Sequence, residues 1–288
     1  MKRIAILGPG LLGGSIALNL RESGAAHVSL WARRQAAVDD ILARGCADEA
    51  SISIEKVAAD ADLVVMCVPI GAMEPLSQEL RGVIRKEAII TDVGSVKQGV
   101  VAGLDRVFQE YGRFVGSHPM AGSEETGMAA ARNDLFTGKT CIVTPSSHTD
   151  AAALHDVVEF WKQLGCKYVC QLSPEAHDEC VGLVSHLPHL IAAALVNTVA
   201  DTNPAAFEVV GPGFRDTTRV AGGPPAMWQE ILTENSTAVL RALDAMIAKL
   251  TTFRQTLVLH SAETSKVEII ATLAAAQSTR DRIFPKKK

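Results

Sequence analysis

The sequence predicts an α/β fold in which an N-terminal, doubly wound and mostly parallel sheet is followed by an all-helical C-terminal half. In the first half, short β-branched apolar runs alternate with segments of helical length. Near residue 171 this alternation stops, and no later run is typical of a strand. Since 288 residues are enough for two domains, we expect one domain over residues 1–171 and a second over 172–288.

The predicted strands are short, apolar and closed by glycine, proline or polar residues, as buried strands of a parallel sheet are. They cover residues 3–7, 28–31, 63–68, 88–91 and 114–116, with two more at 140–144 and 167–170. Helical segments such as 11–22 and 36–44 lie between them. Because a crossover of this length joins parallel neighbours, the alternation predicts a parallel, doubly wound sheet.

The second half is predicted to be helical, with interruptions at Pro188 and at a loop over 211–225. Apolar residues recur at helical spacing over 226–250, and 257–273 reads as another long helix. These helices carry more apolar surface than a small helical domain can bury. We therefore expect a homodimer that forms through this half of the chain.

Composition and charge exclude several classes of partner. The formal net charge of −4 gives no electrostatic footprint for nucleic acid or an anionic membrane, and the basic run over 286–288 reads as a solvated tail. No window is expected to approach the ~20 uncharged apolar residues that span a bilayer. The first apolar run breaks at Gly8 and Pro9, too early for a secretory signal.

The six cysteines are scattered, and no two of them form a CxxC pair. Several lie in apolar runs, where cysteine usually acts as a small hydrophobic residue. This pattern predicts neither a metal site nor disulfides, and it places the protein in the reducing cytoplasm.

A glycine-rich turn follows the first predicted strand. Gly8, Gly10 and Gly13 match GxGxxG, and Leu11 and Leu12 open the helix that follows. This context predicts a Rossmann-type dinucleotide site, in which the glycines allow a tight turn and close backbone approach while the helix N-terminus binds the pyrophosphate. A structural turn without a ligand is the alternative.

The end of the second strand bears on the choice of cofactor. Ala32 stands where NAD sites usually carry an acid, and Arg33 and Arg34 follow. We therefore expect NADP to be preferred, with NAD still possible, although a pair of solvated surface arginines would give the same sequence. Three residues at later strand ends, Val68, Pro69 and Asp92, complete the expected cofactor contacts.

Four polar clusters carry the chemistry. The sequences DVGSVK (92–97) and GSHPMAGSE (116–124) each close a predicted strand, where α/β sheets place their ligand contacts. SHLPH (185–189) puts two histidines on one helix face. GFRDTTR (213–219), followed by a tryptophan, is a loop dense in charge and aromatic bulk.

Together with GPGLLGGS, these clusters resemble the prephenate/arogenate dehydrogenase family of tyrosine biosynthesis over almost the whole chain. The resemblance implies oxidative decarboxylation of a cyclohexadienol, in which hydride leaves C4, CO2 leaves C1 and the ring aromatises. It assigns His118 as the base that takes the C4 hydroxyl proton, for which a histidine of near-neutral pKa is suited. Ser95 would bond the same hydroxyl or orient His118.

The resemblance also implies a substrate pocket. Arg219 would bind a substrate carboxylate, because guanidinium matches carboxylate bidentately, or else pair with Asp216. The other residues assigned to the pocket are Ser123, Glu124, His186, His189, Asp216 and Trp228, of which Trp228 would shield the ring from water.

Two other functions remain as alternatives. A β-hydroxyacid-type dehydrogenase shares this plan, but it would use a lysine on a helix, and the middle of the chain has no Lys-x3-Asn pattern. A non-catalytic NADP-binding sensor dimer would have no need of His118, Ser95 and Arg219 together. Between the two substrates we favour prephenate, because no acid that could pair with the arogenate ammonium lies between Val220 and Gln229.

Overall fold

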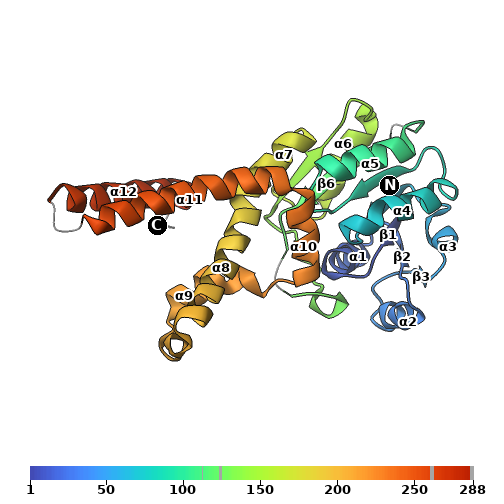
Figure 1. Ribbon diagram of the computed structural model, residues 1–288. Coiled ribbons are helices and arrows are strands. Elements are labelled where there is room, and N and C mark those ends of the chain that lie inside the picture. Colours follow the sequence, from blue (N-terminus) through green and yellow to red (C-terminus); the bar gives the residue numbers. More distant parts are fainter. Residues whose placement is uncertain (112, 123–124, 260–262, 286–288) are drawn as a thin grey trace. The chain divides into compact units, whose positions relative to one another are not determined.

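The computed structural model describes residues 1–111, 113–122, 125–259 and 263–285. An eight-stranded sheet lies in the N-terminal part of the chain (Figure 1), with the strand order β3-β2-β1-β4-β5-β6-β7-β8. The strands are β1 (Arg3–Leu7), β2 (His27–Trp31), β3 (Glu49–Ser51), β4 (Leu63–Met66), β5 (Ile89–Asp92), β6 (Phe114–Pro119), β7 (Thr140–Thr144) and β8 (Tyr168–Gln171).

Six neighbouring strand pairs are parallel, and β7 runs antiparallel to β6. The predicted, mostly parallel sheet is therefore confirmed. The strand that the sequence did not predict is β3, which has three residues and pairs with β2 at the sheet edge. A strand this short carries too little apolar pattern to be recognised.

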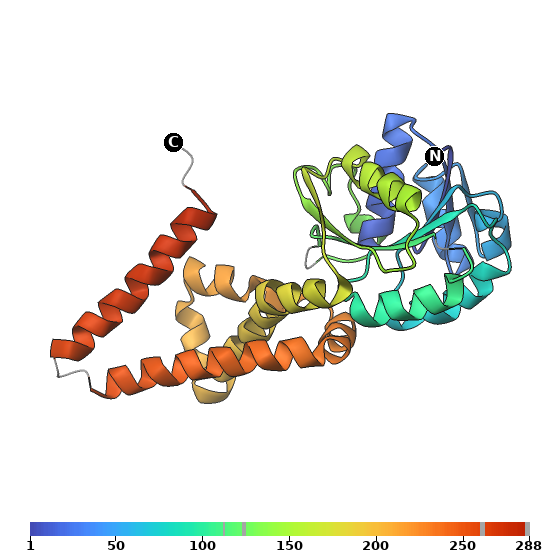
Figure 2. The ribbon, with the colours of Figure 1, turned by 90° about the horizontal axis from the view of Figure 1, so that it is seen from above.

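Helices cover both faces of the sheet, as Figure 2 shows for the N-terminal part. The apolar cluster on one face includes α1 (Leu11–Ser23), α2 (Gln35–Ala43) and α6 (Ala151–Gln163), and that on the other includes α3 (Ile54–Ala58), α4 (Ile70–Arg81) and α5 (Gln98–Phe108). Along β1, Ile4 and Ile6 pack on the first face while Ala5 and Leu7 pack on the second. This two-residue alternation is what a strand buried on both faces produces.

Beyond β8 the described residues contain helices and no strand. The elements are α7 (Pro174–Val181), a π-helical turn η2 (Gly182–His186), α8 (Leu187–Thr202), η3 (Pro204–Val209), α9 (Pro212–Thr218), η4 (Arg219–Gly222), α10 (Pro225–Glu234), α11 (Ser236–Val258) and α12 (Glu263–Ile283). The chain forms two compact units, residues 1–238 and 239–288.

Two expectations for this half were wrong, and a third was confirmed. The expected loop over 211–225 contains the short helices α9 and η4. The helical character expected over 226–250 is confirmed by α10 and α11, which are separated at Asn235, whose φ is −103° and ψ is 26°. No single helix covers 257–273, because α11 ends at Val258 and α12 begins at Glu263.

Pro188 does not interrupt the helix as expected. Because proline has no N–H to donate, the chain passes it through the π-helical turn η2, in which the Leu187 N–H bonds the Gly182 carbonyl. Gly182 permits this turn to lie close to the first turn of α11, where a Cβ would come within 3.2 Å of the Ala238 Cβ. Helical turns of this kind often occur at functional sites.

The expectation about membrane spans also needs correction. Among the described residues, one helix, Pro174–Thr202, is long and apolar enough to cross a bilayer by length and composition. A core helix passes the same test. In the segment Pro174–Thr202, the buried residues include His177, Asp178 and His186. Ionisable groups are costly in a hydrocarbon layer. This favours the interpretation as a core helix.

Candidate active site

The turn between β1 and α1 is shaped for close contact. Gly8 has a φ of +116°, and a Cβ there would lie 2.4 Å from the Cys67 carbonyl oxygen. A Cβ on Gly13 would lie 2.1 Å from the Gly8 carbonyl oxygen. Nothing lies within 4 Å of the Cβ position at Gly10, which caps α1 without a side-chain bond. The free N–H groups of the first turn of α1 can therefore bind an anion.

The end of β2 carries the residues that were expected to select the cofactor. Ala32 is buried, whereas Arg33 and Arg34 are exposed. Arg34 lines a surface hollow together with Pro9 of the glycine turn and with Asp40 and Arg44 of the α2 region. Arg44 Nε lies 2.8 Å from Asp40 Oδ1. This hollow thus brings two arginines and one carboxylate next to the glycine turn.

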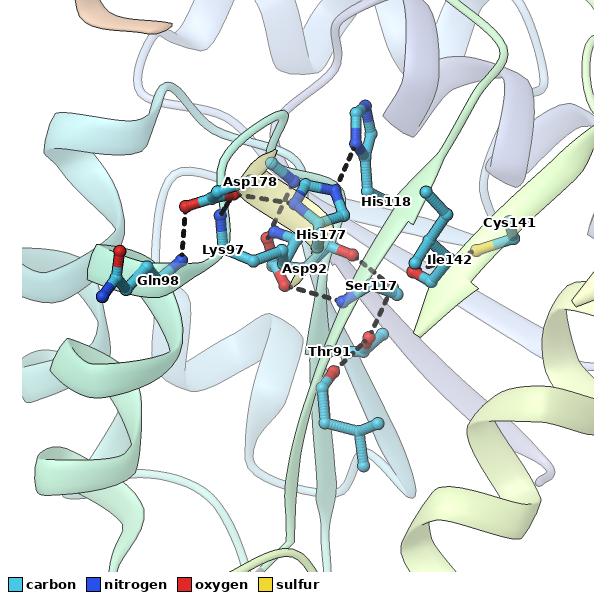
Figure 3. A network of polar contacts seen from close by, with 12 residues as sticks. Thr91, Asp92, Lys97, Gln98, Ser117, His118, Cys141, Ile142, His177 and Asp178 are labelled. Carbon is cyan, nitrogen blue, oxygen red and sulfur yellow. Dashed lines mark hydrogen bonds and ion pairs between the residues drawn. The ribbon is translucent and has the colours of Figure 1, made fainter. Parts of the chain in front are cut away.

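A buried ion pair closes the loop after β5. Lys97 Nζ lies 2.5 Å from Asp92 Oδ2, and both side chains are fully buried (Figure 3). Asp92 also accepts hydrogen bonds from the backbone N–H groups of Gly94 and Ser117. The expected cofactor residue Asp92 therefore directs its carboxylate to groups of the protein.

A chain of three polar side chains runs from β6 to α7. His118 Nδ1 lies 2.8 Å from His177 Nε2, and His177 Nδ1 lies 2.7 Å from Asp178 Oδ1 (Figure 3). Asp178 accepts two further bonds, from the backbone N–H of Lys97 at 2.8 Å and of Gln98 at 2.9 Å. The loop after β5 and the first helix of the C-terminal half are thereby joined through one carboxylate.

Burial governs the ionisation of His118 and His177. Desolvation, with further contributions from His177, Lys97 and His186, holds the pKa of His118 well below its ordinary value of 6.5. Desolvation also lowers the pKa of His177, although Asp178 partly offsets it. The near-neutral pKa that we expected for His118 is therefore wrong, and both rings are neutral at neutral pH.

Asp178 is ionised in spite of its burial. Desolvation raises its pKa, but the hydrogen bonds from His177 and from the backbone of Gln98 and Lys97 outweigh this, and the net pKa is lowered. Asn235 holds the next part of the network. Its Nδ2 donates to the Asp178 backbone carbonyl at 2.8 Å and lies 3.1 Å from His186 Nδ1.

His186 and His189 form an aromatic wall with Trp228. Both histidines are buried, on η2 and α8 respectively. The His189 ring stacks on the Trp228 indole with centroids 3.6 Å apart, and His186 meets the same indole edge-on at 6.1 Å. Desolvation lowers the pKa of His186 to about 4, although Asp178 and the Ser95 carbonyl partly oppose it. Desolvation also lowers the pKa of His189, which the Val220 carbonyl partly opposes.

The other predicted substrate residues are only partly placed. Ser95 is half-buried with its carbonyl toward His186, and Asp216 and Arg219 are exposed on α9 and η4. Arg219 directly precedes Val220, whose carbonyl is directed at His189. Ser123 and Glu124 lie outside the described residues.

The remaining cofactor candidates surround the glycine turn. Leu11 and Leu12 form the first turn of α1. Val68 follows β4, and its Cγ1 would lie 3.3 Å from a Cβ on Gly8. Pro69 caps α4.

Sequence reasoning missed His177, Asp178 and Asn235 and gave Lys97 no role. A signal for two of them was present. Asp178 and His186 are eight residues apart and His189 follows three later, so all three fall on one helical face. Extending the pattern of SHLPH toward the N-terminus would have included Asp178, and His177 is its direct neighbour in the chain.

The glycine turn and His118 lie at the same edge of the sheet. β1, β4, β5 and β6 are parallel neighbours, so their carboxyl ends meet at one edge. Three strand spacings, roughly 14 Å in all, separate β1 from β6. Ligands of open α/β sheets bind along this edge, and an extended dinucleotide is long enough to reach from β1 to β6.

Comparison with known families agrees with this arrangement. Residues 16–170 match the family described as prephenate dehydrogenase, nucleotide-binding domain. Residues 173–273 match prephenate dehydrogenase, dimerization domain. Over 258 residues the chain is 35% identical to a cyclohexadienyl dehydrogenase of Zymomonas mobilis, covering 88% of this chain and 87% of that protein.

Solved structures show the same fold. A prephenate dehydrogenase from A. aeolicus, in complex with hydroxyphenyl propionate and NAD+, superposes with a TM-score of 0.90 at 33% identity, covering 98% of each chain. An arogenate dehydrogenase from Synechocystis superposes with a TM-score of 0.82 at 29% identity, covering 98% of this chain and 99% of that one.

Acid should destabilise the folded protein through the buried histidines. His186 has a pKa of about 4 when folded and 6.5 ordinarily, so between these values the unfolded chain binds more protons. Its stabilising contribution is complete above pH 6.5 and is lost as the pH falls toward 4. This one residue should cost on the order of 3 kcal/mol of unfolding free energy over that interval.

Urea unfolding at a series of pH values measures this loss. His186→Gln should make the dependence on pH shallower, because the variant lacks the titrating ring. The same slope in the variant as in the wild type would contradict the assignment.

Proposed function

We propose that this chain, which belongs to the prephenate dehydrogenase family, oxidatively decarboxylates prephenate or arogenate. It is an NAD(P)-dependent dehydrogenase. The observation that carries the proposal is His118, a buried and neutral histidine at the same sheet edge as the glycine turn. A base and a dinucleotide site are the two elements that this oxidation requires.

The residues present fit a bound dinucleotide. Gly8 and Gly13 leave the space that a backbone-hugging pyrophosphate needs, and the N-terminus of α1 supplies N–H donors. Val68 and Pro69 would contact the cofactor from the end of β4. The nicotinamide supplies the hydride acceptor for the hydrogen on substrate C4.

His118 would act on the C4 hydroxyl. Its free ring nitrogen takes the hydroxyl proton as the C4–H bond breaks, and C4 becomes a carbonyl. The C1–CO2 bond then breaks, its electron pair enters the ring, and the ring aromatises to a phenolate. Return of the proton to the phenolate oxygen restores neutral His118 and gives 4-hydroxyphenylpyruvate, or tyrosine from arogenate.

The pocket residues would orient the ring. Trp228 and His189, stacked on each other, form an aromatic face that excludes water. Ser95 would bond the C4 hydroxyl, and Arg219 would bind a substrate carboxylate. Ser123, Glu124, His186 and Asp216 would complete the pocket.

Replacing His118 by asparagine should lower kcat by roughly 10²- to 10⁴-fold, because general base catalysis is lost. Cofactor affinity should change little, since the glycine turn is untouched. Steady-state kinetics with prephenate and arogenate, following reduced nicotinamide, measures both. A variant that keeps its kcat would refute the role of His118 as the base.

We also propose that NADP+ is preferred over NAD+. Arg34 lines the hollow beside Pro9, where Arg44 and Asp40 also lie, so the hollow carries a net positive charge that suits an added 2′-phosphate. Arg33 is exposed beside it.

Changing Arg33 and Arg34 to alanine should raise the KM for NADP+ far more than that for NAD+. Because only Arg34 lines the hollow, the single variant Arg34→Ala should account for most of the effect, with Arg33→Ala as its matched control. Equal effects on both cofactors, or a wild-type preference for NAD+, would reject the preference.

Prephenate is proposed as the better substrate. An arogenate ammonium would need a carboxylate partner once desolvated. Among the described residues, Asp92 and Asp178 bond protein donors, Glu230 lies 3.5 Å from the Gly71 N–H, and Asp216 is exposed.

The ratio of kcat/KM for prephenate and arogenate, at saturating NADP+, tests the choice. We expect it to favour prephenate. A tenfold ratio in favour of arogenate, about 1.4 kcal/mol of transition-state binding, would show that a group of the site recognises the amine.

We infer a homodimer that forms through the helical domain over 172–288, with 1–171 as the dinucleotide-binding domain. The compact unit over 239–288 exposes many large apolar side chains on α11 and α12, and burial against a second copy would remove them from water.

The six cysteines are free thiols, in keeping with a cytoplasmic location.

Sedimentation at micromolar concentration should give the mass of two chains. Charged substitutions at Ile270 and Leu273, exposed on α12, should weaken the dimer, whereas changes at exposed polar residues of α2 should not. A wild-type chain that sediments as a monomer would contradict the inference.

A further inference from the structure

We propose that His177 is a positioning residue that holds the proton of neutral His118 on Nδ1 and so keeps the His118 Nε2 lone pair free. The inference rests on the proposed function for what His118 deprotonates, and on the geometry of the buried chain for the rest. His177 touches neither substrate nor cofactor in this scheme, since it acts through His118.

Asp178 determines which nitrogen of His177 carries the proton. Its carboxylate is ionised and can only accept hydrogen bonds. Oδ1 and Oδ2 accept from the backbone N–H groups of Lys97 and Gln98, at 2.8 and 2.9 Å. The contact of 2.7 Å between Asp178 Oδ1 and His177 Nδ1 therefore requires a proton on that nitrogen.

His177 in turn determines which nitrogen of His118 carries the proton. The ring is fully buried and neutral, so with Nδ1 protonated its Nε2 carries a lone pair. The contact of 2.8 Å between this nitrogen and His118 Nδ1 then requires a proton on His118 Nδ1. Because His118 is neutral as well, its remaining nitrogen, Nε2, is unprotonated.

The backbone keeps this order from reversing. Asp178 is held by two N–H groups that cannot turn into acceptors, so its carboxylate stays an acceptor toward His177. The buried ion pair of Lys97 and Asp92 also holds the loop after β5 in place. With either ring flipped to the other tautomer, two donors or two acceptors would face each other in a dry interior, which is costly.

His177 and Ser95 also differ in the histidine that each of them contacts. His118 Nδ1 contacts His177, whereas Ser95 directs its carbonyl toward His186. When His118 takes a proton on Nε2, the Nδ1–H···Nε2 bond to His177 becomes charge-assisted and stronger. The same neighbour therefore orients the base before the reaction and supports its cation afterward.

Two variants of similar volume separate this role from packing. In His177→Gln the side-chain amide can accept from His118 with its oxygen and donate to Asp178 with its nitrogen. In His177→Leu neither bond is available. Thermal denaturation first establishes that each variant is folded.

Two-bond ¹H–¹⁵N correlation spectra of ¹⁵N-histidine protein report the tautomer of His118 without any need for turnover. We expect the Nδ1–H form in the wild type and in His177→Gln, and a gain of the Nε2–H form in His177→Leu. An Nε2–H form in the wild type, or an unchanged Nδ1–H form in a folded Leu variant, would overturn the proposal. If the Leu variant does not fold, the wild-type and Gln spectra decide.

Kinetics supply the second readout. His177→Leu should lower kcat roughly 10- to 100-fold with KM values changed less than about twofold, and His177→Gln should recover most of the loss. Equal losses in two folded variants would contradict positioning by hydrogen bonds. A wild type without turnover would reject the proposed function, and the spectra would still test His177.

Discussion

The carboxylate of Asp178 is the group on which the rest of the site depends. It is buried and ionised, and its two oxygens accept from Lys97, Gln98 and His177. An ionised group in the interior is tolerated only when its hydrogen bonds are complete. The chain meets this need by bringing the loop after β5 against α7, and that contact places His177 beside His118. Without this carboxylate, neither ring would have a fixed proton.

The fold divides the work between two ends of one sheet edge. In the proposed function, Gly8 at the end of β1 would serve the cofactor through backbone geometry, which needs space rather than charge. In the proposed function, His118 at the end of β6 would act on the substrate through a desolvated ring that contacts His177. The parallel run of β1, β4, β5 and β6 makes these two ends neighbours, although more than 100 residues separate them in the chain. The helix through Pro188 carries His186, which contributes to lowering the pKa of His118.

Local patterns allowed much of this to be predicted from the sequence. Strand–helix alternation indicated the sheet and GxGxxG the turn at Gly8, while the role of His118 as the base remains a prediction from the family resemblance. What local patterns could not give were the features that tertiary contact decides. The three-residue β3 has too little pattern, and Pro188 continues a helix because η2 changes the hydrogen-bond spacing. The neutral state of His118 follows from burial beside Lys97 and His177, groups that are distant or unremarkable in the sequence.

Burial keeps His118 neutral at neutral pH, so under the proposed function it can accept a proton there without first losing one. The most direct test is the pH dependence of kcat/KM for prephenate, which reports ionisations of the free enzyme. With the pKa of His118 held well below 6.5, the wild type should give a constant kcat/KM from about pH 8 down through 6.5. The decline should begin only in more acidic solution, as His118 becomes protonated. A decline centred at or above pH 6.5 would contradict this central claim.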